Sequence, residues 1–104
     1  MIGKTVTVVI DRPLGSYHPE LYYPVNYGYI EGVIAPDGEE QDAYVLGVCQ
    51  PLETFTGTVI AIIHRLDDVE DKWVVAPAGT MLDANEIRDQ VAFQERFFQS
   101  VILT

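Results

Sequence analysis

YYPVNYGYIEGVIAPDGEEQDAYVLGV, residues 22–48, limits how this chain can fold more than any other segment. Its first part belongs to a stretch rich in Gly, Pro and Tyr, residues 14–32, where Pro19 and Pro24 exclude a helix, so we expect loop and irregular strand there. An acidic turn, Asp37–Asp42, follows, and the apolar run Ala43–Cys49 has the length of a buried strand. The segment therefore predicts β-structure on both sides of an acidic turn.

The rest of the chain extends this β-rich pattern and adds one helix. Further strands are predicted at Thr5–Ile10, Thr58–Ile63 and Trp73–Ala76, with a charged turn at Leu66–Lys72. Asp83 and Glu86 form the capping box of a helix over residues 84–100, and its apolar positions recur at helical spacing: Ile87, Val91, Phe98 and Ile102. Four or five short strands with one C-terminal helix predict an α+β, mainly β, fold compatible with a small closed β-barrel.

Length and composition indicate a single domain, residues 1–104, that is soluble and cytoplasmic. The chain has 104 residues, 48% of them hydrophobic and 21% charged, which suffices for one core. No apolar run reaches the roughly 18–20 residues of a membrane helix, and the first residues lack the layout of a signal peptide. The single cysteine, Cys49, fits a reducing compartment, and we expect it to be a small core residue.

The charge excludes one class of partner and leaves two interpretations of the acidic residues open. Sixteen carboxylates face six Lys and Arg, for a net charge of -10, and the cations are scattered, so nucleic acid is a poor partner. Carboxylates gather in two clusters, which are either solvated loops or a site for hard divalent cations. The first cluster contains Asp37, Glu39, Glu40 and Asp42, and the second Asp67, Asp68, Glu70 and Asp71.

Tyrosines are unusually dense just before the acidic turn. Four of the eight residues from Tyr22 to Tyr29 are tyrosines. They either pack as aromatic groups or line a cleft where their hydroxyls donate hydrogen bonds to phosphate oxygens.

The segment Tyr22–Val48 resembles the central part of the family I, soluble and metal-dependent, inorganic pyrophosphatases, in which Y-P-x-N-Y-G-Y leads into D-G-D-P-x-D. The likeness extends to VVIDRP at 8–13, DDVEDKWVVAP at 67–77 and DQVAFQERFF at 89–98. The resemblance implies a closed five-stranded barrel of OB type, homo-oligomers such as hexamers, and hydrolysis of pyrophosphate to two phosphates. It further implies that Mg²⁺, with Mn²⁺ as a substitute, activates the attacking water.

The resemblance also implies a role for each matching residue. Glu39 would be the general base, Asp42 would bridge the two activating metal ions, and Lys72 and Tyr27 would stabilise the reacting phosphoryl group. Substrate contacts would come from Lys72, Tyr27, Tyr23 and His18. Metal ligands would be Asp37, Asp42, Asp67, Asp11 and either Glu70 or Asp71.

Three departures from the family pattern predict a thinner phosphate-binding shell. A lysine after the first strand and an arginine before the Tyr-Pro pair have no counterpart, with only His18 near the first of these positions, and Phe98-Gln99 replaces a Tyr-Lys pair on the last helix. Turnover is therefore expected to be reduced. The alternative is a catalytically degenerate, metal-dependent binding module for a phosphorylated metabolite or a nucleotide.

Overall fold

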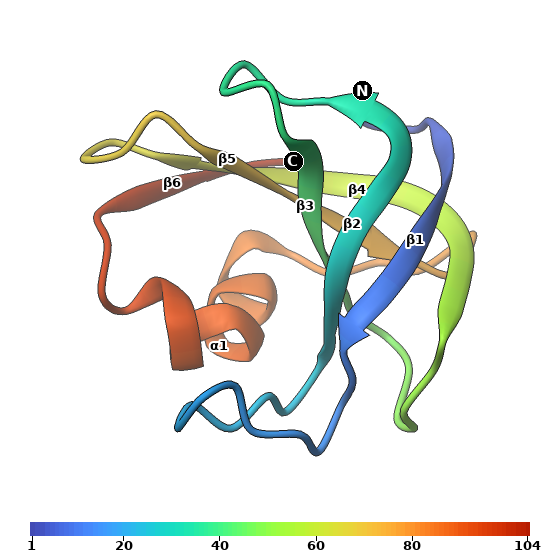
Figure 1. Cartoon of the computed structure of the whole chain (residues 1–104). Helices are drawn as coiled ribbons and strands as arrows, with labels where there is room; N and C mark the ends of the chain where they lie inside the picture. The colour runs from blue at the N-terminus through green and yellow to red at the C-terminus, as the bar shows by residue number, and fades with distance from the viewer.

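Six strands and one helix make up the structure, a computed structural model that describes residues 1–104 (Figure 1). In chain order the elements are β1 (Thr5–Arg12), β2 (Asn26–Ile34), β3 (Glu40–Val45), β4 (Thr54–Arg65), β5 (Asp71–Ala76), α1 (Ala84–Glu95) and β6 (Ser100–Leu103).

The strands form a closed barrel because the long strand β4 pairs along one edge with both β1 and β6. The strand order is β1-β2-β3-β5-β4-β6, and β1 also pairs with β4. Residues 54–58 of β4 pair with β1 and close a barrel of five strands, while residues 62–65 pair with β6. All pairs are antiparallel except β3 with β5, which is parallel. The predicted five-stranded barrel of OB type with a C-terminal helix is confirmed.

Alternating side chains give the barrel wall two apolar faces. One face points into the barrel and includes Val8, Val45 and Val75. The opposite face carries Tyr44 and Val74, which pack with Ile87 of α1 in a second core outside the barrel. In Figure 1 the helix lies beside the barrel wall, below β5 and β6. Since β3 and β5 contribute to both cores, their position in the wall is fixed from both sides.

The predicted C-terminal end of the helix is wrong. The helix ends at Glu95, so Phe98 lies beyond it and Ile102 belongs to β6. The apolar spacing continues past Glu95 and therefore predicted a longer helix. Residues 100–103 instead pair with residues 62–65 of β4 as a strand. Residues 26–32 lie in β2, and the register of this strand against β3 shifts between Tyr29 and Ile34, in agreement with the irregular strand expected there. Gly28 is required in β2 because a Cβ at this position would lie 1.8 Å from the Val9 carbonyl oxygen.

Cys49 is exposed in the loop after β3, not buried as expected, because that strand already ends at Val45. Trp73 is buried inside the barrel. The helix α1 is neither long nor apolar enough to cross a membrane.

Candidate active site

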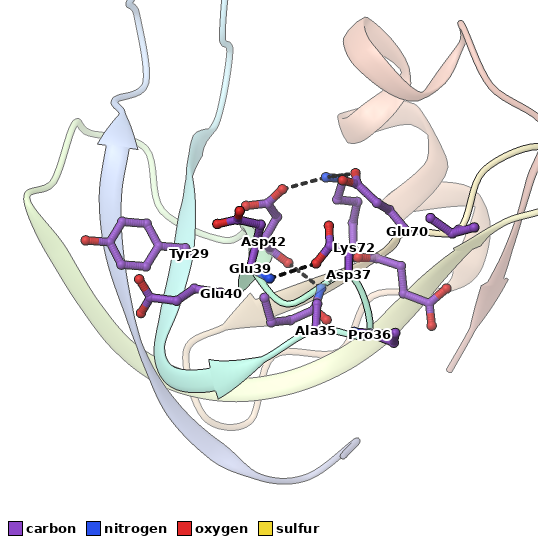
Figure 2. A pocket seen from close by; sticks show the side chains of 12 residues that line it. Tyr29, Ala35, Pro36, Asp37, Glu39, Glu40, Asp42, Glu70 and Lys72 are labelled. Atoms are coloured by element: carbon purple, nitrogen blue, oxygen red, sulfur yellow. Dashed lines mark hydrogen bonds and ion pairs between the residues drawn. The ribbon is translucent and has the colours of Figure 1, made fainter.

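An acidic pocket of about 310 Å³ lies where the chain enters β3 and β5 (Figure 2). Parallel neighbouring strands begin at the same edge of a sheet, so the turn before β3 and the loop before β5 meet there. Each of these connections carries one of the two acidic clusters. The pocket is lined by Tyr29, Ala35, Pro36, Asp37, Glu39, Glu40, Gln41, Asp42, Val69, Glu70, Asp71 and Lys72.

Lys72 joins the two sides of this pocket. Its Nζ donates to Asp42 Oδ2 at 2.6 Å and to Glu70 Oε2 at 2.8 Å, and the residue is only 4% exposed. Burial disfavours the charged amine, but Tyr27 and the hydrogen bonds to Asp42 and Glu70 outweigh it and hold the pKa of Lys72 above its ordinary value. The ammonium therefore stays charged throughout the physiological pH range.

The turn before β3 presents two further carboxylates. Gly38 has a φ of +88°, which lets the chain turn sharply between Asp37 and Glu39. The Glu39 amide donates to Asp37 Oδ1 at 3.0 Å, and the Ala35 amide donates to the Glu39 carbonyl at 2.7 Å. Both side chains are exposed at the pocket, so they are accessible to a metal ion or a substrate.

The tyrosines Tyr27 and Tyr23 form an aromatic floor beside the pocket without lining it. Their ring centroids are 5.6 Å apart, and Lys72 Nζ lies 5.9 Å from the centroid of Tyr27. Burial is the main cause that raises the pKa of Tyr27 to about 12; Lys72 opposes the rise and Asp42 supports it. Tyr27 is therefore a neutral phenol at physiological pH. The Tyr23 hydroxyl donates to Gln94 Oε1 at 2.5 Å, which ties this floor to α1.

Besides Tyr23 and Tyr27, three more of the expected site residues do not line the acidic pocket. Asp67 accepts hydrogen bonds from the Gln99 amide, 3.2 Å from each carboxylate oxygen. Asp11 is exposed at an irregularity of β1, and the His18 ring packs edge-on against Tyr23 with 6.1 Å between centroids. Of the pair that replaces Tyr-Lys, Phe98 stacks on Arg65, whose guanidinium carbon lies 3.7 Å from the centroid of the Phe98 ring, and Phe98 does not line the pocket.

The donor set of the pocket suits a hard divalent cation, although it is not arranged around one. Asp37, Asp42, Glu70 and Asp71 offer carboxylate oxygens, which Mg²⁺ and Mn²⁺ prefer. The structure contains no group of three His, Cys, Asp or Glu side chains placed to hold a metal. Asp42 and Glu70 are instead hydrogen-bonded to the Lys72 ammonium. A metal ion could bind Asp42 only by replacing this ammonium.

A buried ion pair supports the pocket, and the sequence alone did not reveal it. Arg65 donates from Nε and Nη2 to the carboxylate of Glu95 at 3.0 and 2.7 Å. Tyr44 donates its hydroxyl to Glu95 Oε2 at 2.5 Å, and Arg65 Nη1 lies 3.6 Å from Glu70 Oε2. Arg65 and Glu95 are thirty positions apart in the chain, and no local spacing marks them as partners.

The family model described as inorganic pyrophosphatase matches residues 3–101 of the chain. Among curated proteins, the chain is similar to the inorganic pyrophosphatase of Caulobacter vibrioides, with 33% identity over 64 residues that cover 56% of this chain and 34% of that protein.

Solved inorganic pyrophosphatases share the fold. The structure from Ehrlichia chaffeensis superposes with a TM-score of 0.72 at 16% identity, covering 96% of this chain and 85% of the other. The structure from Neisseria gonorrhoeae gives a TM-score of 0.66 at 24% identity, covering 88% of this chain and 72% of the other.

Proposed function

Since the chain belongs to the inorganic pyrophosphatase family, we propose that it hydrolyses inorganic pyrophosphate to two phosphates with the help of Mg²⁺. The observation that carries this proposal is the acidic pocket itself. It gathers carboxylates from two separate connections around one buried ammonium, that of Lys72. The residues assigned from the resemblance that lie in it are Asp37, Glu39, Asp42, Glu70, Asp71 and Lys72.

The metal requirement follows from charge. Pyrophosphate is a multiply charged anion, and a pocket of carboxylates repels it unless cations reverse the local field. Asp37 and Asp42, together with Glu70 or Asp71, would hold the ions, and Mn²⁺ would substitute for Mg²⁺ on the same oxygens. When bound, the metal neutralises the substrate and makes a water molecule more acidic.

The chain's own groups supply proton transfer and orientation. The Glu39 carboxylate accepts a proton from the attacking water as the water oxygen bonds to phosphorus. The bridging P–O bond breaks, and its electron pair leaves with the second phosphate. Lys72 would donate to a phosphoryl oxygen if Asp42 held a metal in place of the ammonium, and the neutral Tyr27 hydroxyl would be a second donor beside it. Because the phosphate shell is thinned, we expect a reduced rate.

Phosphate release from pyrophosphate with Mg²⁺ tests the proposal. Glu39→Gln and Asp42→Asn remove the proton acceptor and a metal ligand, so release should fall by roughly 100-fold or more. The control is Asp89→Asn, a matched charge change at an exposed position on α1, and it should keep the wild-type rate. A wild type no faster than these variants would exclude hydrolysis and favour the binding module.

Substrate range and assembly remain predictions from the resemblance, and the cytoplasmic location remains a prediction from the composition of the chain. Tripolyphosphate and nucleoside triphosphates in the same assay identify any other phosphoanhydride that is cleaved. Sedimentation distinguishes a hexamer from smaller homo-oligomers, and fractionation of cells tests the cytoplasmic location.

A further inference from the structure

Arg12 is a half-buried cation that has no acidic partner. Arg65 and Lys72 are both paired with carboxylates, while Lys4, Arg88 and Arg96 are exposed to solvent. Arg12 is the remaining member of the six, and no carboxylate oxygen lies within ion-pair distance of it in a chain with a net charge of -10. A partly desolvated charge without a counter-charge is unfavourable, which points to an anion that binds there.

A β-bulge turns Arg12 toward the tyrosine floor. The register of β1 against β2 shifts between Ile10, opposite Gly28, and Arg12, opposite Tyr27, so Asp11 is the extra residue. Such a bulge redirects the side chain that follows it. The Arg12 guanidinium carbon lies 5.4 Å from the ring centroid of Tyr23 and 5.7 Å from that of Tyr27, and Nη1 donates to the Tyr23 hydroxyl. The two rings and this hydrogen bond hold the guanidinium in one orientation.

Tyr27 connects Arg12 to the acidic pocket. Lys72 Nζ lies 5.9 Å from the same ring, so both cations adjoin one side chain. An arginine has five N–H donors, and only one hydrogen bond of Arg12, the one to Tyr23, is formed. The remaining donors are arranged in the planar fork that matches two oxygens of a phosphoryl group.

We propose that Arg12 is a substrate-binding residue that takes one phosphoryl group of pyrophosphate while Lys72 takes the other. The proposal rests on the function proposed above and assigns a cation to the phosphate shell in which three expected basic residues are missing. The proposal also gives the bulge at Asp11 a role. The bulge places Arg12 opposite Tyr27, at a position that the acidic Asp11 would take in a regular strand.

Calorimetry with methylenediphosphonate, a pyrophosphate analogue that is not hydrolysed, measures this contact without turnover. With Mg²⁺ present, Arg12→Gln should bind the analogue roughly 10- to 100-fold more weakly, the usual effect of losing a charge-assisted contact. Arg88→Gln, an equal change of charge on the exposed face of α1, should bind it like the wild type. Mg²⁺ binding alone should be equal in all three proteins, which a general structural defect in Arg12→Gln would not allow.

NMR of the wild type gives a second readout that needs no folded variant. The chain has four arginines, and on addition of the analogue the Nε–H signal of Arg12 should shift while those of Arg88 and Arg96 stay. Unchanged affinity in Arg12→Gln, or an unshifted Arg12 signal at saturation, would overturn the role of Arg12 and leave the hydrolytic function intact. A wild type that neither binds the analogue nor cleaves pyrophosphate would overturn both.

Discussion

Lys72 is the residue on which the state of the pocket depends. Its ammonium bridges Asp42 of β3 and Glu70 of the loop before β5. A metal ion and the ammonium cannot both occupy the same carboxylate oxygen, so they compete for Asp42. Metal binding would therefore free Lys72 for a phosphate, which makes the residue a partner of the carboxylates in one state and of the substrate in the other.

Replacing Lys72 by Met should therefore affect metal and substrate in opposite directions. Mg²⁺ affinity should rise about 5- to 20-fold, because about 1–2 kcal/mol of competition by a positive charge is removed. Pyrophosphate cleavage should fall, because a donor to the phosphoryl oxygens is lost. Titration calorimetry with Mg²⁺ and the phosphate-release assay measure the two effects, with Lys4→Met, an exposed lysine, as control. Weaker Mg²⁺ binding in Lys72→Met would contradict the competition.

At this scale the sequence identified groups that are neighbours in the chain. Asp37, Glu39 and Asp42 are close together in the chain, as are Glu70 and Lys72, so clustering in the sequence pointed to the carboxylates and the family resemblance assigned the roles. The position of Arg12 depends on a bulge, and the environment of Asp67 depends on the Gln99 amide. Both are set by contacts between distant residues, which local spacing does not contain.

Among the elements, the start of α1 was predictable and its end was not. Asp83 accepts from the Glu86 amide at 2.8 Å, and Glu86 Oε1 accepts from the Asp83 amide at 3.2 Å, so the predicted capping box is confirmed. A cap is encoded within four residues. The helix ends before residues 100–103, which form β6 instead of continuing the helix. The stability of β6 depends on hydrogen bonds to the free edge of β4, which is distant in the chain.

The ion pair between Arg65 and Glu95 fastens α1 to β4. Glu95→Ala leaves a guanidinium buried without its bidentate partner and should lower the free energy of unfolding by about 3–5 kcal/mol. Arg65→Met should be costly by itself, and the double variant should lose less than the sum of the two single variants. Urea denaturation gives the three values, and Asp89→Ala on the exposed face of the same helix serves as control. Strictly additive losses would mean that the pair is not coupled.

For the whole molecule, barrel closure is what turns two acidic segments into one site. The clusters are separated by the whole of β4 in the chain, yet the parallel pairing of β3 with β5 brings their connections to one edge. Composition reveals the clusters but not the pairing, which is why solvated loops and a metal site could not be told apart from the sequence. Closure through β1 and β4 fixes that edge within the wall.

A molecule with a net charge of -10 and clustered carboxylates should be stabilised by Mg²⁺ well beyond the effect of salt. General screening by NaCl weakens repulsion over the whole surface, whereas an ion bound only by the folded state adds about 2.7 kcal/mol at a hundredfold excess over its Kd. For a domain of this size, each kcal/mol raises Tm by roughly 4 °C or more.

Thermal unfolding at matched ionic strength separates the two effects. Mg²⁺ should raise Tm well above the value in NaCl for the wild type and for Asp89→Asn, while Asp42→Asn should lose most of this difference because a central ligand oxygen is gone. Chelation with EDTA should return the wild type to its value in NaCl. Equal stabilisation of all three proteins by Mg²⁺ and NaCl would show that the acidic edge is a screened surface and not a metal site.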